Sequence, residues 1–360
     1  MKFGSTRPAM RNQARAGLTG ALLLCLGASG PASAASLADW EACSAIIADV
    51  DRLACYDRVS GRAQPEAAPP PPAVAEAAAQ PAALAAEPPA SSALLSALSR
   101  HWELDDAAKQ GAFLFRAHRP NYFLPAKYSS QPNSTPFQGT LIQPDLGLDA
   151  LEAKLQLSFK IKAIEGVLGH DDLDLWFGYT ATSFWQAYNN DISSPFRETN
   201  YEPEAMLVLR TDGEFAGFRW RFLNLGFVHE SNGRGATLSR SWNRAYAQFG
   251  FERGELAVLV RPWYRLPETD GVDDNPDIED YLGHGDLQLI YRKGRNAYSL
   301  LLRNNLKSDN RGALQLNWSF PLYGRLKGFV QYFNGYGESL IDYNHSQQTF
   351  GIGVSLTEGM

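Results

Sequence analysis

Long apolar runs are missing from most of this chain. Beyond residue 34, no segment approaches the ~18 consecutive apolar residues that a membrane-spanning helix requires. The mature protein therefore has no candidate transmembrane helix. Soluble secretion is the default interpretation, and a membrane β-barrel must be argued against it.

The chain also has a small net charge and few cysteines. The formal net charge is -6, so the chain lacks the basic excess that is typical of a nucleic-acid-binding protein. Of the three cysteines, Cys25 lies in the N-terminal leader described below. The other two, Cys43 and Cys55, are predicted to form a disulfide in an oxidising compartment. A metal site at this pair is a weaker alternative, because no histidine lies near it.

Residues 1–34 have the three parts of a secretory signal peptide. Basic residues begin the segment, residues 16–28 form a short apolar run, and Ala32-Ser33-Ala34 offers a cleavage site for a signal peptidase. Leu24-Cys25 suggests a lipoprotein site as an alternative, but leucine directly before the cysteine fits that pattern poorly. Simple cleavage is the preferred interpretation.

Two segments separate the leader from the main domain. In residues 35–62 apolar residues recur three and four positions apart, which indicates helices. With its two cysteines, this segment is predicted to be a small periplasmic helical hairpin. Residues 63–99 are dominated by alanine and proline and are predicted to form a linker. The main domain then extends over residues 100–360.

The main domain is predicted to contain twelve strands. Their expected ranges are 112–119, 153–163, 173–186, 203–211, 217–230, 240–251, 255–265, 284–293, 296–305, 311–320, 326–335 and 347–357. Long connections (120–152, 187–202, 266–283 and 336–346) alternate with shorter ones. This asymmetry is typical of an outer-membrane barrel, and an even strand count places both termini in the periplasm. The sequence therefore predicts an all-β fold, a twelve-stranded antiparallel transmembrane β-barrel with a narrow or filled lumen.

A candidate catalytic site lies at the end of the strand expected over 217–230. His229 and Ser231 leave the same face of an extended chain, because side chains alternate with a period of two. A hairpin that returns through Gly233 brings Asn243 beside His229. These three side chains then supply a nucleophile, a base and a group that orients the base.

The face that carries this site is apolar. It includes Leu223, Leu225 and Phe227, whereas Asn224 and Gly226 lie on the opposite face. In a soluble sandwich the apolar face is buried, where a hydrolytic site cannot meet its substrate. In a membrane barrel the apolar face meets lipid, so a serine triad at its edge predicts a lipid substrate.

Four stretches of the main domain resemble outer-membrane phospholipase A. They are SSPFRETNYEP (193–203), HESNGRGATLSRSWNR (229–244), DDNPDI (273–278) and GYGESLIDYN (335–344). That family is a twelve-stranded barrel that is active as a homodimer and requires calcium. The resemblance implies a phospholipase A1/A2 that hydrolyses acyl-ester bonds (sn-1 and sn-2) of phospholipids and lysophospholipids. It also implies an outer-membrane location, with the site facing the outer leaflet.

The resemblance assigns catalytic roles to residues at matching positions. Ser231 is implied as the nucleophile, His229 as the base and Asn243 as the orienting residue. The backbone amide of Gly233 is implied as a donor to the oxyanion.

The resemblance also implies a calcium site at the dimer interface. Its ligands are the backbone carbonyl of Arg234 and Ser239, with Ser193 approaching from the other subunit. The chain departs from the family at Ala236, where an acidic residue is frequent, and at Ala181, where a glutamine can bridge the dimer.

Other interpretations stay open. The main alternative is a non-enzymatic barrel, either a small porin or a scaffold; a protease is disfavoured, because a lipid-facing site points away from soluble peptides. The acidic cluster in residues 270–280 offers a second calcium site, but it lacks EF-hand spacing, and a solvated loop is preferred. Trp176, Trp185, Trp220 and Trp263 are expected in the aromatic girdles of the barrel.

Overall fold

The computed structural model describes residues 37–46, 49–60, 95–138, 147–268 and 273–356. They belong to two compact units that divide between residues 81 and 82. The predicted signal peptide and the predicted linker as far as residue 94 lie outside the described residues. Within the described ranges, no helix has both the length and the apolar character needed to cross a membrane.

The N-terminal unit is a pair of short helices, α1 (Leu37–Ser44) and α2 (Asp49–Val59). Cys43 and Cys55 form a disulfide between them, with Cα atoms 5.5 Å apart, as the sequence predicts. The rings of Trp40 and Tyr56 stack across the pair with centroids 5.8 Å apart. Because a unit of this size buries little apolar surface, the disulfide supplies much of its stability.

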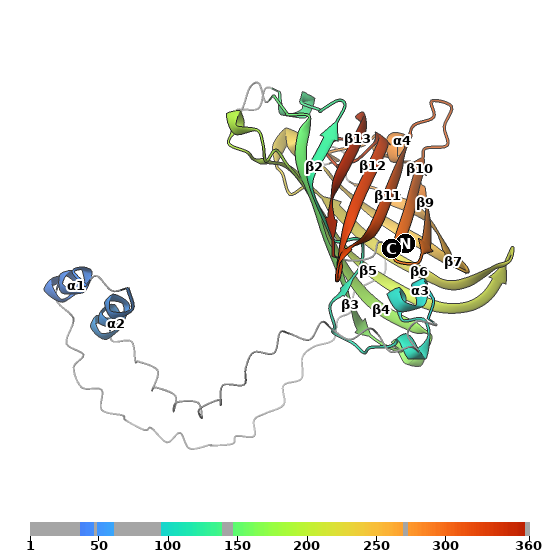
Figure 1. The fold of residues 1–360 in the computed structure, drawn as a ribbon, viewed down its shortest axis with the longest axis horizontal. Coiled ribbons are helices and arrows are strands. Elements are labelled where there is room, and N and C mark those ends of the chain that lie inside the picture. The colour runs from blue at the N-terminus through green and yellow to red at the C-terminus, as the bar shows by residue number, and fades with distance from the viewer. Residues whose placement is uncertain (1–36, 47–48, 61–94, 139–146, 269–272, 357–360) are drawn as a thin grey trace, which may run out of the picture. The chain divides into compact units, whose positions relative to one another are not determined.

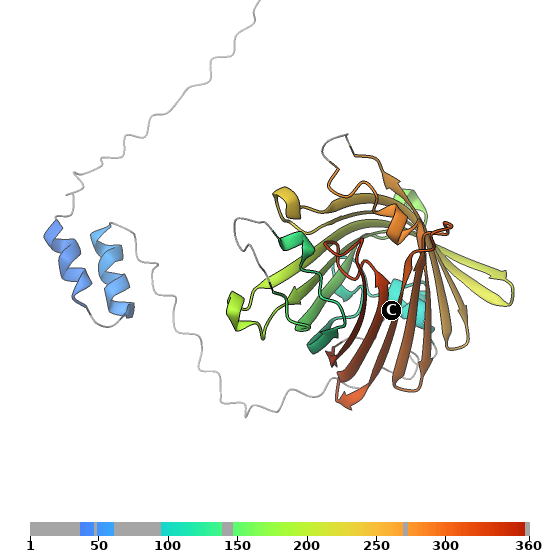
Figure 2. The ribbon, with the colours of Figure 1, turned by 90° about the horizontal axis from the view of Figure 1, so that it is seen from above.

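The second unit is a closed antiparallel barrel of twelve strands, which confirms the predicted fold (Figure 1). Each strand pairs with the next in sequence, and β13 pairs with β2 to complete the ring seen in Figure 2. The strands are β2 (Tyr122–Ser129), β3 (Leu151–Ile164), β4 (Leu173–Trp185), β5 (Phe196–Phe215), β6 (Phe218–Ser231), β7 (Ser241–Arg253), β8 (Leu256–Leu266), β9 (Gly285–Lys293), β10 (Asn296–Asn304), β11 (Gly312–Tyr323), β12 (Leu326–Tyr336) and β13 (Ser346–Ser355).

The first strand lies further along the chain than the sequence predicts. Within the expected range 112–119, only β1 (Arg116–Ala117) is a strand, and it pairs with β3. Because β4 occupies the opposite edge of β3, β1 and β2 follow one another along the same edge. Pro120 lies between them and has no backbone N–H to donate to the ladder. The first strand is therefore interrupted, and its longer part begins at Tyr122.

The connections at the two rims differ in length, as predicted. At the short-turn rim, four of the five connections have two residues each, namely 216–217, 254–255, 294–295 and 324–325. At the long-loop rim the connections are 130–150, 186–195, 232–240, 267–284, 305–311 and 337–345, and α4 (Glu279–Leu282) lies in one of them. Ser231 ends β6 at the long-loop rim.

Side chains along β6 alternate between the outer surface and the lumen. Leu225 and Phe227 are exposed on the outer surface, whereas Asn224 is fully buried in the lumen. The glycine at position 226 is explained by Tyr246 of β7, whose ring occupies the space that a side chain would need. The predicted assignment of the two faces is therefore confirmed for this part of the strand.

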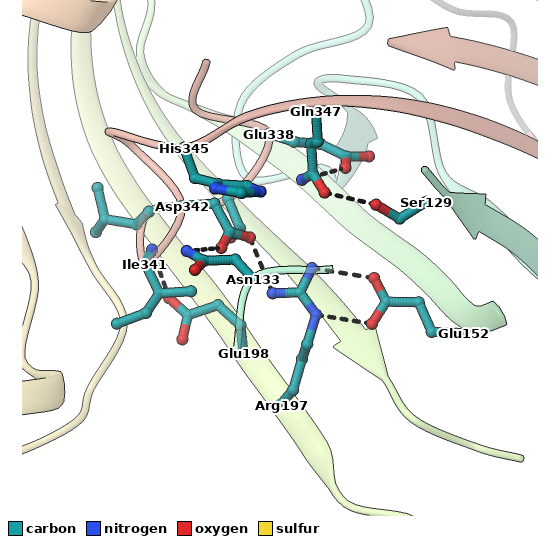
Figure 3. Close-up of polar contacts among 12 residues, drawn as sticks. Ser129, Asn133, Glu152, Arg197, Glu198, Glu338, Ile341, Asp342, His345 and Gln347 are labelled. Carbon is teal, nitrogen blue, oxygen red and sulfur yellow. Dashed lines mark hydrogen bonds and ion pairs between the residues drawn. The ribbon is translucent and has the colours of Figure 1, made fainter. Parts of the chain in front are cut away.

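The β12–β13 connection, residues 337–345, folds into the lumen at the long-loop rim. Figure 3 shows its contacts with Arg197 and Glu198 of β5. Arg197 of β5 holds it in place. Its guanidinium donates to both carboxylate oxygens of Glu152, at 2.7 and 3.0 Å, and to Asp342 of the connection, at 2.9 Å. All three side chains are at least 95 % buried, so each charge depends on the others for compensation.

The same ion-pair network, continued through Lys127, anchors the connection at a second point. Glu338 lies 2.9 Å from the ammonium group of Lys127 and 3.1 Å from that of Lys154. Burial raises the pKa of Glu338, but the two ammonium groups outweigh burial and lower the pKa to about 2. The carboxylate therefore stays charged at neutral pH and binds the connection to the barrel wall.

The helix α3 (Ala97–Trp102) packs inside the barrel near the short-turn rim. The backbone N–H of Leu98 donates to Glu252 near the end of β7, at 2.8 Å. The ammonium group of the fully buried Lys160 lies 3.2 Å from the centroid of the Trp102 ring, a cation–π contact. The lumen is thus filled at both ends, as the barrel size predicts.

Two tryptophans that were expected in the aromatic girdles lie inside the barrel instead. Trp176 is fully buried, and its ring meets that of Trp102 edge-on at 6.0 Å. Trp263 is 7 % exposed and packs edge-on against Trp242. The girdle prediction is wrong for these two residues, because the interior of the barrel holds apolar clusters as well as ion pairs.

Candidate active site

The β6–β7 hairpin brings His229 and Asn243 together. They are direct partners in the antiparallel register, as are Ser231 and Ser241. The Nδ1 atom of His229 lies 2.9 Å from the Oδ1 atom of Asn243. Because an amide oxygen only accepts, Nδ1 must carry the proton and donate it. The Nε2 atom of the neutral ring is then unprotonated and available as a base.

Ser231 lies two residues beyond His229 on the same face of β6. Tyr201 of β5 and Ser241 of β7 are its neighbours in the register. Among the described residues, Ser231 forms no hydrogen bond with His229, so the third contact of the predicted triad is not made in this geometry. Catalytic hydrogen bonds are often long before substrate binds, and the shared face keeps the two groups adjacent.

An apolar groove extends from His229 over the outer surface. It has a volume of about 420 Å³, and β3 to β6 form its walls, chiefly through Phe159, Ile161, Phe177 and Phe227. These phenylalanines are 39 to 45 % exposed. A groove of hydrocarbon that opens on the outside of a barrel matches the chemistry of an acyl chain.

Asn232 organises the β6–β7 connection. Its buried side chain accepts hydrogen bonds from the backbone N–H groups of Arg234, at 3.2 Å, and Arg240, at 3.0 Å. Its amide nitrogen donates to the carbonyl of Leu238 at 2.8 Å. One side chain thus ties both ends of the connection together.

Gly233 and Arg234 occupy defined positions in this connection. Gly233 has a φ of 63°, and a side chain there would meet the Tyr201 ring at 3.3 Å, so glycine satisfies both constraints. The Arg234 side chain reaches back to β5, where it pairs with Glu198 at 3.3 Å and donates to the backbone carbonyl of Arg197. The contacts with Tyr201, Glu198 and Arg197 of β5 therefore restrict the positions of the Gly233 amide and the Arg234 carbonyl.

Ser239 lies beside a carboxylate that the sequence analysis did not assign to it. Its hydroxyl donates to Oδ2 of Asp274, in the β8–β9 connection, at 2.5 Å. Asp274 thus places a carboxylate beside the β6–β7 connection. That connection itself carries Ala236 at the position where the family frequently has an acidic residue. Ser193 is exposed in the β4–β5 connection. Its contribution to another subunit stays a prediction.

Other carboxylates of the β8–β9 connection are engaged by neighbouring side chains. Asp273 accepts two hydrogen bonds from Arg265, at 2.7 and 2.8 Å. Asp277 accepts from the Tyr343 hydroxyl at 2.6 Å, and burial together with this bond raises the pKa of Tyr343. These contacts favour an ion-paired loop over a second calcium site; Asp270 lies outside the described residues.

A family model described as phospholipase A1 matches residues 98–356. The chain belongs to this family. The match includes the whole barrel, with the β6–β7 hairpin, and all of α3 except its first residue.

Relatives of the phospholipase A1 family cover different shares of the chain. A Neisseria meningitidis serogroup B protein that is assigned as a phospholipase A1 is 41% identical over 348 residues, which are 88% of this chain and 90% of that protein. The phospholipase A1 of Escherichia coli K12 is 42% identical over 207 residues, or 58% of this chain and 70% of that protein.

Solved structures give the same family. The outer membrane phospholipase A of Escherichia coli has a TM-score of 0.64 at 37% identity, and the match covers 68% of this chain and 99% of that one. A Salmonella typhi outer membrane phospholipase, a dimer with bound calcium, also has a TM-score of 0.64, at 36% identity over 71% of this chain and 95% of that one. The protein described here is accordingly an outer-membrane β-barrel of the phospholipase A1 family.

For three residues, the sequence predicted no contact with the catalytic site or with the calcium site beside it. Asn232 and Asp274 stand in matched motifs but are polar residues in connections, where such residues are common. Glu268 accepts a hydrogen bond from the Asn243 amide nitrogen at 3.2 Å. Glu268 follows a proline in a long connection. No local sequence pattern predicts its contact with Asn243, because the two residues are 25 positions apart.

Proposed function

We propose that this protein hydrolyses acyl-ester bonds of phospholipids and lysophospholipids in the outer membrane and releases fatty acid. The observation that carries the proposal is the 2.9 Å contact between His229 Nδ1 and Asn243 Oδ1. Ser231 follows His229 on the same outward face, beside the apolar groove. A site of this kind faces acyl chains in the bilayer rather than solutes in water.

In the proposed reaction, the Ser231 hydroxyl oxygen attacks the ester carbonyl carbon while His229 Nε2 accepts its proton. The tetrahedral intermediate collapses, the ester C–O bond breaks, and the leaving alkoxide takes the proton from His229. Lysophospholipid departs and an acyl-serine remains. Water then attacks the acyl-serine with His229 again as base, and the fatty acid leaves.

Asn243 and Gly233 support these steps. The Asn243 oxygen keeps the proton of His229 on Nδ1, so that Nε2 faces the reaction in every cycle. The Gly233 N–H is the proposed donor to the oxyanion, and its position is restricted by the positive φ and by Tyr201. A donor that is already placed lowers the barrier more than one that must reorient.

We also propose a calcium ion at the β6–β7 connection and a homodimer as the active form. The Arg234 carbonyl and the Ser239 hydroxyl are oxygen donors of the type calcium prefers, and Asp274 adds negative charge beside Ser239. Ser193 is the proposed ligand from the partner subunit. When bound, calcium supplies positive charge near the oxyanion. The related Salmonella typhi protein is a dimer with bound calcium, which supports this proposal.

Asn232 provides a first prediction about this site. Asn232→Ala removes the hydrogen bonds that join the ends of the connection, so the Arg234 carbonyl and Ser239 lose their fixed separation. If the lost hydrogen bonds together contribute about 1.4 kcal/mol, which is a tenfold change in affinity, half-maximal activity should require about tenfold more calcium. A calcium titration of fatty-acid release measures this. Asn224→Ala, which alters a buried asparagine deep in the lumen, should leave the titration unchanged, and an unchanged curve for both variants would contradict the role of Asn232.

The activity itself is tested with refolded full-length protein in micelles of a diacyl phospholipid. We expect release of lysophospholipid and fatty acid, and we expect a fluorophosphonate probe to add its mass to the peptide that contains Ser231. If a folded barrel gives neither result, the non-enzymatic barrel becomes the better interpretation. Cleavage of a peptide substrate without lipid hydrolysis would instead indicate a protease.

A further inference from the structure

We propose that Glu268 is a positioning residue for the catalytic site, acting through Asn243. This inference rests on the proposed function, because it extends the predicted Ser231–His229–Asn243 triad by one member. The observation behind it is the hydrogen bond from Asn243 Nδ2 to Glu268 Oε1, at 3.2 Å.

The order of strands places these groups in one row. His229 of β6 pairs with Asn243 of β7, and Asn243 pairs with Leu266 at the end of β8. Glu268 lies two residues beyond Leu266, so an extended chain turns its side chain toward the same face. The row therefore continues from the base, through the amide, to a carboxylate.

Glu268 decides which way the Asn243 amide faces. An asparagine side chain can present either its oxygen or its NH2 group to a neighbour, and the two orientations have the same shape. A carboxylate only accepts hydrogen bonds, so it selects the orientation in which NH2 points to Glu268. The oxygen must then point to His229, as the 2.9 Å contact requires. Without Glu268, the flipped amide would present a donor to Nδ1 and favour the wrong tautomer.

Glu268 also supplies a charge that the triad itself lacks. An asparagine cannot offset the positive charge that His229 acquires when it accepts a proton, whereas a carboxylate can. A hydrogen bond to a carboxylate is about twice as strong as one between neutral groups. Within the described part of the chain, the Asn243 amide is the one group that hydrogen-bonds to Glu268, and Glu268 is partly buried. Among the described residues, its charge is therefore directed at the site rather than shared in an ion pair.

The test compares variants of the full-length protein in the phospholipid micelle assay. Glu268→Ala is expected to lower kcat about tenfold with little change in KM, because the groove that binds the acyl chain is untouched. Glu268→Gln keeps an acceptor oxygen but loses the charge, so it should recover only part of the loss. Glu279→Ala, which removes another glutamate of the same connection, should retain full activity. Mobility of unheated samples on SDS gels confirms that each barrel is folded.

A double-mutant comparison shows whether Glu268 acts through Asn243. In an Asn243→Ala background, adding Glu268→Ala should have no further effect, since the group it positions is gone. A tenfold loss that persists in that background would overturn the inference, and so would a Glu268→Ala variant as active as the wild type. A folded wild-type protein without lipid hydrolysis would defeat the proposed function, and this inference with it.

Discussion

Ser231→Ala is expected to lower the rate of phospholipid hydrolysis by about 10⁴- to 10⁶-fold. The variant keeps His229, Asn243 and the apolar groove, so it should still bind lipid. It loses the hydroxyl that is the proposed nucleophile, however, so no acyl-enzyme should form. Fatty-acid release from micelles measures the rate, and the variant should not react with a fluorophosphonate probe.

Ser241→Ala is the matched control for this change. Ser241 is the register partner of Ser231 across the β6–β7 hairpin and is also partly buried, so the substitution alters the same part of the barrel. Its activity should stay close to that of the wild type. If Ser231→Ala retained most of its activity while folded, the serine-hydrolase mechanism would have to be abandoned.

Removal of calcium is expected to have the second largest effect. Loss of one oxyanion-stabilising interaction lowers an enzyme rate by about 100- to 1000-fold, and excess chelator should reduce fatty-acid release by at least this factor. Restoring calcium should restore the rate. Magnesium should not substitute, because it demands a tighter octahedral site than a flexible connection provides.

The ligand assignment has its own control. Ser239→Ala should raise the calcium concentration required for activity, whereas Thr237→Ala in the same connection should not. Hydrolysis that persists in excess chelator would leave the serine mechanism intact and would remove the calcium assignment. It would also show that the Gly233 amide and other protein groups suffice for the oxyanion.

The outer face of the barrel could be predicted from sequence because it follows a local rule. Strict alternation along β6 assigned Phe227 to the lipid side and Asn224 to the lumen, and both assignments hold. The rule fails where the backbone departs from regular geometry. A register shift between Trp220 and Phe222 turns Arg221 inward, where it is 3 % exposed. One extra residue at a bulge moves every side chain that precedes it in the strand to the opposite face of the sheet.

The contacts that fill the lumen could not be predicted in this way. Arg197 and Asp342 are 145 positions apart in the sequence, and Trp102 meets Trp176 from α3, a helix that the sequence did not predict and that crosses the expected boundary between linker and barrel. Such pairs depend on the closure of the whole ring. The same limit applies to the site: the spacing of His229 and Ser231 is local, whereas the approach of Glu268 requires a third strand.

The closed lumen has a consequence for the cell that carries this protein. A twelve-stranded barrel with an empty interior would admit small solutes and weaken the barrier that the outer membrane provides. Here α3 lies at one end of the interior and the 337–345 connection at the other, with ion pairs and tryptophan rings packed against them. The protein can therefore be present at all times without acting as a leak. Any harm it does to the membrane must come from its lipid-facing surface.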